Sequence, residues 1–197
     1  MAPSPDPLPL CVDLDGTLIE TDVLAESLLL ACRSWTTLYA LSRLVWRGKA
    51  GLKAGLARLC PIACDLLPYD AALIAFLETR KAQGQRLFLV TGTNIAVARR
   101  INEHLGNLFD DVMASDDHIN LRGEHKARAL VERFGERGFV YIGNDATDLK
   151  VWSRAAGAMI VGASASVVRR AQRTCRVEQI FTHRKRRFAR LFGAICL

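Results

Sequence analysis

The chain has 197 residues, which is enough for one domain or for one domain with a modest insertion. Half of the residues are hydrophobic, and of six cysteines only Cys60 and Cys64 are close neighbours, with no second pair or nearby histidine to complete a zinc site. The net charge is +7, but residues 1–9 lack the basic start and apolar core of a signal peptide, so reduced thiols in a cytoplasm are the simplest interpretation.

Short apolar runs alternate with helical patterns along most of the chain. This alternation predicts an α/β fold, in which a parallel sheet lies between two layers of helices. The predicted strands are residues 8–12, 87–90, 111–114, 139–142 and 158–161. The predicted helices are residues 69–83, 95–105, 126–134 and 149–156.

Residues 22–68 interrupt this alternation, because two or more helices fit there and no strand is convincing. Residues 25–45 are strongly apolar, but Glu26, Arg33 and Arg43 interrupt them. A transmembrane span needs about 20 apolar residues almost without charge, so helices that pack on each other are the better interpretation. An insertion directly after the first strand would lie over the carboxyl edge of the sheet. We therefore expect a helical cap over a site.

Two carboxylates, Asp13 and Asp15, follow the first predicted strand, and Gly16 and Thr17 come directly after them. Open α/β folds bind ligands at the carboxyl ends of their strands. Two acids this close repel each other unless a cation lies between them, so the pair suggests a divalent metal, and Mg²⁺ typically brings phosphate with it. Asp13 could attack phosphorus, while Asp15 could protonate the leaving oxygen and then activate water. The simpler alternative is a strand followed by a polar turn.

Thr91 and Gly92 follow the second predicted strand and lead into a helix. A hydroxyl and backbone N–H groups at the start of a helix can bind an anion, which predicts a phosphate site. The alternative is an ordinary helix N-cap at Thr93 or Asn94.

Lys126 lies near the start of a predicted helix, where a positive charge opposes the helix dipole. The position therefore adds nothing to the stability of the helix, and a phosphate or carboxylate partner would explain the lysine. His125 and Arg128 are nearby alternatives.

Three polar side chains, Asn144, Asp145 and Asp148, follow the fourth predicted strand and precede a helix. Acidic groups at such an edge can complete the coordination of a metal held by Asp13. An amide oxygen of Asn144 can also bind Mg²⁺, but without a full negative charge.

These four motifs, in this order and at predicted strand ends, resemble those of the haloacid dehalogenase-like hydrolases over roughly residues 10–162. The family's last motif has an aspartate where Asn144 stands, and the helical insertion looks like the cap of the phosphoserine phosphatase-like branch. The resemblance implies a Rossmann-like three-layer fold and a Mg²⁺-dependent phosphomonoester hydrolase that acts through an aspartyl-phosphate on Asp13, with Asp15 as acid and base. It implies phosphate binding by Thr91, Gly92 and Lys126, and metal binding by Asp13, Asp15, Asn144, Asp145 and Asp148.

A closer likeness is to the phosphatase-like domain that precedes some UbiA-like polyprenyl transferases. The similar segments are residues 22–28, 67–69, 131–135 and 143–149. This likeness implies an alternative function, namely a weakly active or inactive accessory domain that associates with a membrane prenyltransferase. The substrate of an active enzyme would be a small-molecule or lipid-linked phosphate ester.

Residues 181–197 carry five basic residues and no acid, followed by apolar residues at spacings that suit one helix face. A basic amphipathic helix can lie on an anionic membrane surface, so this tail predicts peripheral membrane or prenyltransferase contact at the inner face of the membrane. No recognised motif supports nucleic-acid binding. The predicted organisation is a core of residues 1–21 and 69–180, a cap of residues 22–68 and a tail of residues 181–197.

Overall fold

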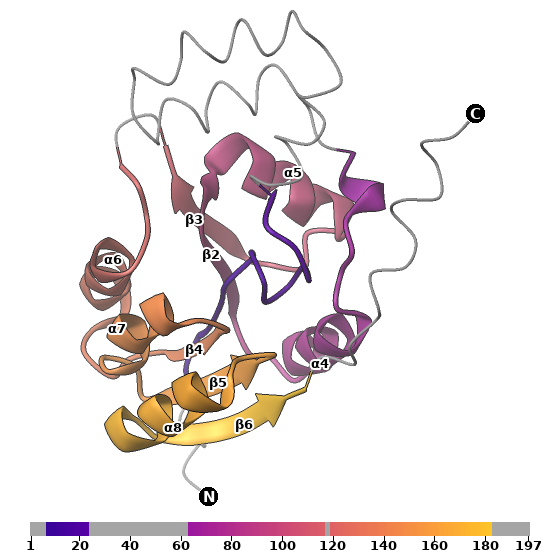
Figure 1. Ribbon diagram of the computed structural model, residues 1–197. Helices are drawn as coiled ribbons and strands as arrows, with labels where there is room; N and C mark the ends of the chain where they lie inside the picture. Colours follow the sequence, from indigo (N-terminus) through magenta and orange to yellow (C-terminus); the bar gives the residue numbers. More distant parts are fainter. Residues whose placement is uncertain (1–6, 24–62, 117–118, 183–197) are drawn as a thin grey trace, which may run out of the picture.

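The computed structural model describes residues 7–23, 63–116 and 119–182 (Figure 1). These residues form one six-stranded sheet with the order β3-β2-β1-β4-β5-β6, and every neighbouring pair of strands is parallel. The predicted Rossmann-like α/β fold is thereby confirmed. The strands are β1 (Leu10–Val12), β2 (Leu87–Asn94), β3 (Asp111–Ser115), β4 (Val140–Gly143), β5 (Gly157–Val161) and β6 (Val177–Phe181).

Helices cover both faces of the sheet, so the core has three layers (Figure 1). One face is covered by α4 (Ala71–Ala82) and α5 (Ile95–His104). The opposite face is covered by α6 (Glu124–Phe134), α7 (Leu149–Trp152) and α8 (Ala165–Thr174). Two short 3-10 helices, η2 (Cys64–Leu66) and η3 (Ala146–Asp148), complete the described elements.

The central strands β1, β4 and β5 are apolar and buried along their whole length, because helices cover both faces of the sheet. In β1, Leu10 and Val12 pack with the helices α4 and α5, whereas Cys11 packs into the cluster on the opposite face. In β4, Tyr141 belongs to the face of α6, α7 and α8, and it is fully buried there. Successive side chains of a strand point to opposite faces, which explains this division.

The centre of the sheet determines where a ligand site can lie. β1 pairs with β2 on one side and with β4 on the other. Along the chain, β2 and β3 are added on one side of β1, and β4, β5 and β6 are added on its other side. The direction in which strands are added therefore reverses between β1 and β4. In open α/β sheets, ligands bind outside the carboxyl ends of the strands at such a reversal. Asp13 follows β1 and Asn144 follows β4, so both lie at this place.

The structure adds α8 and β6, which the sequence prediction omits. Only Val167 and Ala171 of α8 are buried, so its apolar pattern is short. β6 is an edge strand, and its residues Glu178, Gln179 and Ile180 are exposed, so the strand lacks a buried apolar run. The helix predicted at residues 149–156 ends at Trp152, because the chain turns there to enter β5.

The predicted cap, residues 22–68, lies outside the described residues except at its two ends, and so does the predicted tail after residue 182. Phe181, the first residue of that tail, is the last residue of β6 and pairs with Val161 of β5. None of the helices in the described ranges is long and apolar enough to cross a membrane.

Candidate active site

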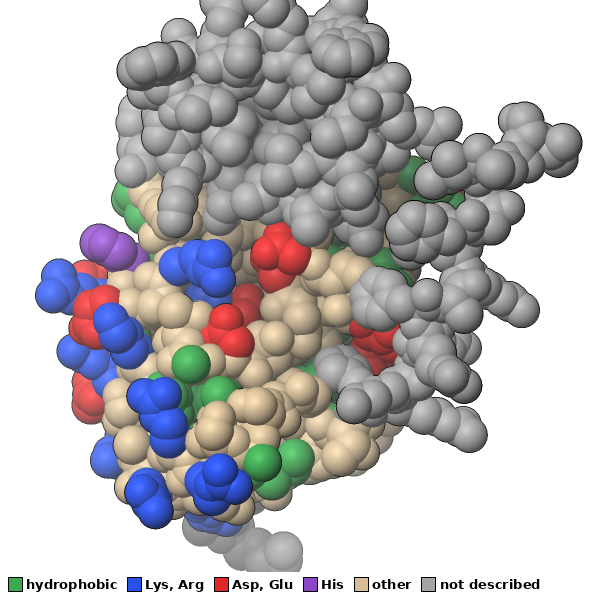
Figure 2. Space-filling model, in the orientation of Figure 1, with side chains coloured by type: hydrophobic (Ala, Val, Ile, Leu, Met, Phe, Trp, Pro, Cys, Tyr) green, Lys and Arg blue, Asp and Glu red, His purple; other side chains and the backbone are tan. Residues whose placement is uncertain are grey.

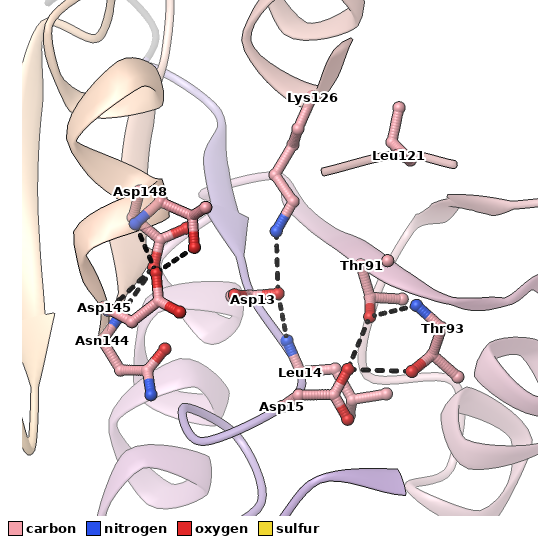
Figure 3. Close-up of polar contacts among 12 residues, drawn as sticks. Asp13, Leu14, Asp15, Thr91, Thr93, Leu121, Lys126, Asn144, Asp145 and Asp148 are labelled. Atoms are coloured by element: carbon pink, nitrogen blue, oxygen red, sulfur yellow. Dashed lines mark hydrogen bonds and ion pairs between the residues drawn. The ribbon is translucent and has the colours of Figure 1, made fainter. Parts of the chain in front are cut away.

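An ion pair between Asp13 and Lys126 lies at the centre of the carboxyl edge (Figure 3). The Nζ of Lys126 lies 2.9 Å from Oδ1 of Asp13, and the backbone N–H of Leu14 donates to the same oxygen at 2.9 Å. Both side chains are nearly inaccessible to water, since the residues are only 9 % and 4 % exposed. None of the described residues hydrogen-bonds the other oxygen of Asp13, Oδ2, so that atom is available to a ligand.

The two partners of this ion pair shift each other's pKa toward the charged form, against the effect of burial. Burial raises the pKa of Asp13, and the neighbouring ammonium of Lys126 opposes the rise. Burial lowers the pKa of Lys126, but the carboxylates of Asp13 and Asp148 more than offset this effect and raise it. Lys126 therefore carries its charge next to Asp13 although it is buried. Neither His125 nor Arg128 takes this place: both are exposed, and Arg128 forms a weak ion pair with Glu124.

Asp15 is held by three donors from different parts of the chain. The backbone N–H of Val23 donates to its Oδ1 at 2.9 Å, and the hydroxyl of Thr93 donates to Oδ2 at 2.8 Å. The hydroxyl of Thr91 approaches the same oxygen at 3.4 Å. Burial raises the pKa of Asp15, although the bonds from Val23 and Thr93 oppose it. A raised pKa suits a carboxyl group that has to carry and release a proton.

Thr91 lies at the carboxyl end of β2, beside the acidic pair (Figure 3), and Gly92 follows it in the same strand. Thr91 is fully buried, and its hydroxyl accepts from the backbone N–H of Thr93 at 3.0 Å. The carbonyl of Gly92 accepts from the hydroxyl of Ser115, which ties this loop to β3. A Cβ atom at Gly92 would lie 2.8 Å from Cγ of Arg122, so the loop between β3 and α6 packs directly on the glycine. Asn94 caps α5 by accepting from the N–H of Ala96.

The three polar residues after β4 have different environments. The Oδ2 of Asp148 accepts from the backbone N–H groups of Asn144 at 2.9 Å and Asp145 at 3.1 Å, and its Oδ1 accepts from the hydroxyl of Tyr141 at 3.0 Å. Burial, followed by the charge of Asp13, raises the pKa of Asp148 to about 6. A Cβ atom at Gly143 would lie 2.5 Å from Oδ2 of Asp148, so glycine is required for this carboxylate to fold back.

The side chains of Asp145 and Asn144 make different contacts on this loop. The carboxylate of Asp145 accepts from the backbone N–H of Thr147 and from its hydroxyl, and it caps η3 in this way. The side chain of Asn144 has no hydrogen-bond partner among the described residues, and it lies against Gly16. Gly16 has a φ of +72°, and a Cβ atom there would overlap the amide of Asn144. The glycine therefore allows the β1 loop and the β4 loop to meet.

The residues at this edge fit a hard divalent cation only in part. The Oδ2 of Asp13 and the amide oxygen of Asn144 have no hydrogen-bond partner in the described ranges, so both could bind a metal. Mg²⁺ prefers oxygen ligands of this kind. The carboxylates of Asp145 and Asp148 already accept the hydrogen bonds described above. No group of three or more histidine, cysteine, aspartate or glutamate side chains in a metal-binding arrangement occurs among these residues. The five-residue metal set therefore stays a prediction, with Asp13 and Asn144 as its best-placed members.

Two residues of the site carry contacts that sequence reasoning missed. The sequence offers Thr93 only as one of two candidates for a helix cap, yet its hydroxyl makes the shortest side-chain bond to Asp15. Tyr141 joins Lys126 to Asp148, although it lies inside a buried strand. Strand alternation offers a signal for Tyr141, because residues 141 and 143 share a face and α6 covers it. A hydroxyl on that face needs a buried polar partner.

The chain belongs to the haloacid dehalogenase-like hydrolase family, whose profile matches residues 10–153. Among curated proteins, it is 36% identical over 158 residues to the uncharacterized protein y4nM of Sinorhizobium fredii. This match covers 79% of the chain but only 30% of that protein, so the chain spans about a third of the length of this relative.

Solved structures of the family have the same fold at low identity. A HAD-family hydrolase from Salmonella enterica serovar Typhi is 18% identical, with a TM-score of 0.62 over 90% of this chain and 69% of that one. A phosphoserine phosphatase, described as a phospho-aspartyl intermediate analogue, is 15% identical, with a TM-score of 0.61 over 89% of this chain and 93% of that one. A substrate-bound phosphoserine phosphatase is 14% identical, with a TM-score of 0.62 over 90% of this chain and 94% of that one.

Proposed function

We propose that the protein is a Mg²⁺-dependent phosphomonoester hydrolase that acts through an aspartyl-phosphate on Asp13. The observation that carries this proposal is the pairing of Lys126 with Oδ1 of Asp13, which leaves Oδ2 without a partner among the described residues. Asp15 lies two residues away with a raised pKa, between Asp13 and the hydroxyls of β2. Side chains that could serve as nucleophile, as acid and as phosphate ligands thus lie at one edge of the sheet, which supports the proposal.

The reaction takes place in two displacements at phosphorus. In the first, Oδ2 of Asp13 forms a bond to phosphorus while the ester P–O bond breaks, and Asp15 donates its proton to the leaving oxygen. In the second, Asp15 accepts a proton from water, whose oxygen attacks phosphorus and releases phosphate from Asp13. Thr91, Gly92 and Lys126 bind the phosphoryl oxygens in both steps. The sum is ester plus water giving alcohol plus phosphate.

Charge neutralisation is the main contribution expected from the metal and the lysine. A carboxylate and a phosphate ester repel each other, and Mg²⁺ when bound would offset the charge of the phosphoryl group. Asp13 and Asn144 would hold it, with the backbone carbonyl of Asp15 as a further ligand. Lys126 supplies a second positive charge, next to Oδ1 of Asp13 (Figure 3). Both charges act in a buried site, where they are stronger than in water.

The test is the substitution Asp13→Asn in an assay of a phosphate ester with Mg²⁺. Asparagine keeps the shape of the side chain but cannot serve as the nucleophile, so we expect kcat to fall by at least about a thousandfold. Asp6→Asn is a matched control, because it removes the same charge from the Pro-rich start of the chain. Circular dichroism should show both variants folded. An unchanged rate in Asp13→Asn would refute the assignment of the nucleophile.

A second candidate function is that of a weakly active or inactive accessory domain of a membrane prenyltransferase. The observation that favours it is Asn144, which replaces a carboxylate of the family's last motif with a neutral amide. The basic tail after residue 182 is the feature that would bind the membrane or the transferase at its cytoplasmic side. The substrate class of an active enzyme, a small-molecule or lipid-linked phosphate ester, belongs to the first candidate.

A further inference from the structure

A buried tyrosine hydroxyl connects two parts of the site that the sequence motifs treat separately. The hydroxyl of Tyr141 accepts from Nζ of Lys126 at 2.8 Å and lies 3.0 Å from Oδ1 of Asp148. An ammonium group has only donors, so the hydroxyl must donate its own hydrogen to the carboxylate. Burial, together with the carboxylates of Asp13 and Asp148, raises the pKa of Tyr141 well above its ordinary value, so the hydroxyl keeps that hydrogen.

This contact restricts the ammonium of Lys126. The group has three N–H donors, of which one binds Asp13 and a second binds Tyr141. No described residue accepts the third N–H, so its direction is determined by the other two. Lys126 is therefore held from two sides.

The same hydroxyl restricts the loop after β4. Its hydrogen bond orients Asp148, whose other oxygen accepts the backbone N–H groups of Asn144 and Asp145. The side chain of Tyr141 thus joins α6, which carries Lys126, to the loop that carries Asn144. Without the hydroxyl, a buried ammonium and a buried carboxylate would each lose a partner. The two would then be drawn together by their charges.

We propose that Tyr141 is a positioning residue, whose hydroxyl aims Lys126 at the transferred phosphoryl group and holds the Asn144 loop against the β1 loop. This inference rests on the proposed phosphatase function and assigns a role to a residue to which the sequence motifs gave none. Tyr141 does not touch the reacting atoms; it acts through Lys126 and Asp148. Its contribution is the geometry of these two groups.

The first test is Tyr141→Phe, which removes one oxygen atom and keeps the ring in the core. We expect kcat to fall by about 10-fold to 100-fold while KM changes much less, because a small misplacement of a charge-stabilising group costs mostly at the transition state. The matched control is Tyr69→Phe. The hydroxyl of Tyr69 is also buried, but it has no hydrogen-bond partner in the described structure, so its removal should leave kcat unchanged.

A double-mutant cycle separates positioning from a general loss of structure. If Tyr141 acts through Asp148, the effects of Tyr141→Phe and Asp148→Asn on kcat should overlap, and the double variant should be little worse than the stronger single variant. Effects that multiply in full would mean that the two residues act independently, and they would overturn the proposal.

A measurement without turnover keeps this inference distinct from the proposed function. Binding of inorganic phosphate in the presence of Mg²⁺, measured by calorimetry, should weaken by about twofold to fivefold in Tyr141→Phe, which is less than the fall in kcat, and stay unchanged in Tyr69→Phe. If the wild type hydrolyses esters, Asp13→Asn is inactive and Tyr141→Phe keeps full kcat, the inference is wrong and the function stands. If the wild type hydrolyses nothing, the function fails. Phosphate binding then decides, and equal affinity in both variants, or no binding by the wild type, overturns the inference.

Discussion

The carboxylates of this site differ in how many hydrogen bonds they accept from the protein. Asp148 and Asp145 accept hydrogen bonds from their own loop, so their charges stabilise the turn after β4. Asp15 is bound by a backbone N–H and by threonine hydroxyls. Asp13 keeps one oxygen without a partner among the described residues, and the neutral amide of Asn144 lies nearby, against Gly16. The site thus presents less negative charge to a cation than its sequence suggests.

Restoring a carboxylate at position 144 should strengthen metal binding. We expect Asn144→Asp to lower the Mg²⁺ concentration for half-maximal activity by about tenfold, because the number of charged ligands sets the affinity for such ions. The measurement is a Mg²⁺ titration of ester hydrolysis after removal of metal with EDTA. Asn107→Asp, in an exposed turn after α5, adds the same charge away from the site and should change nothing.

The wild-type rate in the same assay distinguishes the two candidate functions. A measurable Mg²⁺-dependent rate supports the phosphatase. An inactive wild type that Asn144→Asp makes active would favour the accessory domain instead. If the Mg²⁺ requirement is the same with either residue, Asn144 does not bind the metal.

At the scale of secondary-structure elements, the site depends on how helices begin beside the carboxyl edge. Asp70 is the N-cap of α4, and its carboxylate accepts from the N–H groups of Ala72 and Leu73 at 3.0 Å. Its backbone N–H donates to the carbonyl of Leu18 in the loop after β1. The start of α4 therefore also supports the loop that carries the acidic pair.

Removing this cap should weaken the fold by a defined amount. We expect Asp70→Ala to lower the free energy of unfolding by about 1 kcal/mol, because two N–H groups at the helix start lose their acceptor. Asp70→Asn keeps an acceptor oxygen, so it should lower the free energy of unfolding by only a few tenths of this amount. Urea unfolding followed by circular dichroism gives both values. Equal stability of Asp70→Ala and the wild type would show that the cap contributes nothing.

At the scale of the whole molecule, the basic charge is not confined to the tail. Lys and Arg side chains gather on the face shown in Figure 2, over the side of the core formed by α6, α7 and α8. Between residues 149 and 177 the chain has no acidic residue. The basic residues of this stretch are Lys150, Arg154, Arg169, Arg170, Arg173 and Arg176.

Binding to anionic vesicles tests the role of the tail. Deleting residues 183–197 removes five basic residues and leaves β6 intact, so we expect binding to fall by at least about tenfold, given about 1 kcal/mol for each charge near the surface. Co-sedimentation with vesicles that contain phosphatidylserine measures this. Neutral vesicles and high salt serve as controls, since both weaken an electrostatic contact. Equal binding of both chains would assign it to the basic core, and no binding by either would refute membrane contact.

The sequence alone determined the class of fold and the order of the motifs, because these depend on local patterns. Five apolar runs between helical patterns predict a parallel sheet, and Asp13, Thr91 and Asn144 each follow one of these predicted strands. It did not reveal β6, because an edge strand has one pairing neighbour and needs no continuous apolar run.

Only the tertiary structure decided which side chains meet. Lys126 and Asp13 are 113 positions apart, and Thr93 and Asp15 are 78 positions apart, so no local pattern could pair them. The role of Tyr141 was equally hidden, because a tyrosine in a buried strand is a usual core residue until its hydroxyl is found between a lysine and an aspartate. The motif of Asp13 and Asp15 predicts the chemistry, whereas the packing of α6 against β4 decides how its lysine is held.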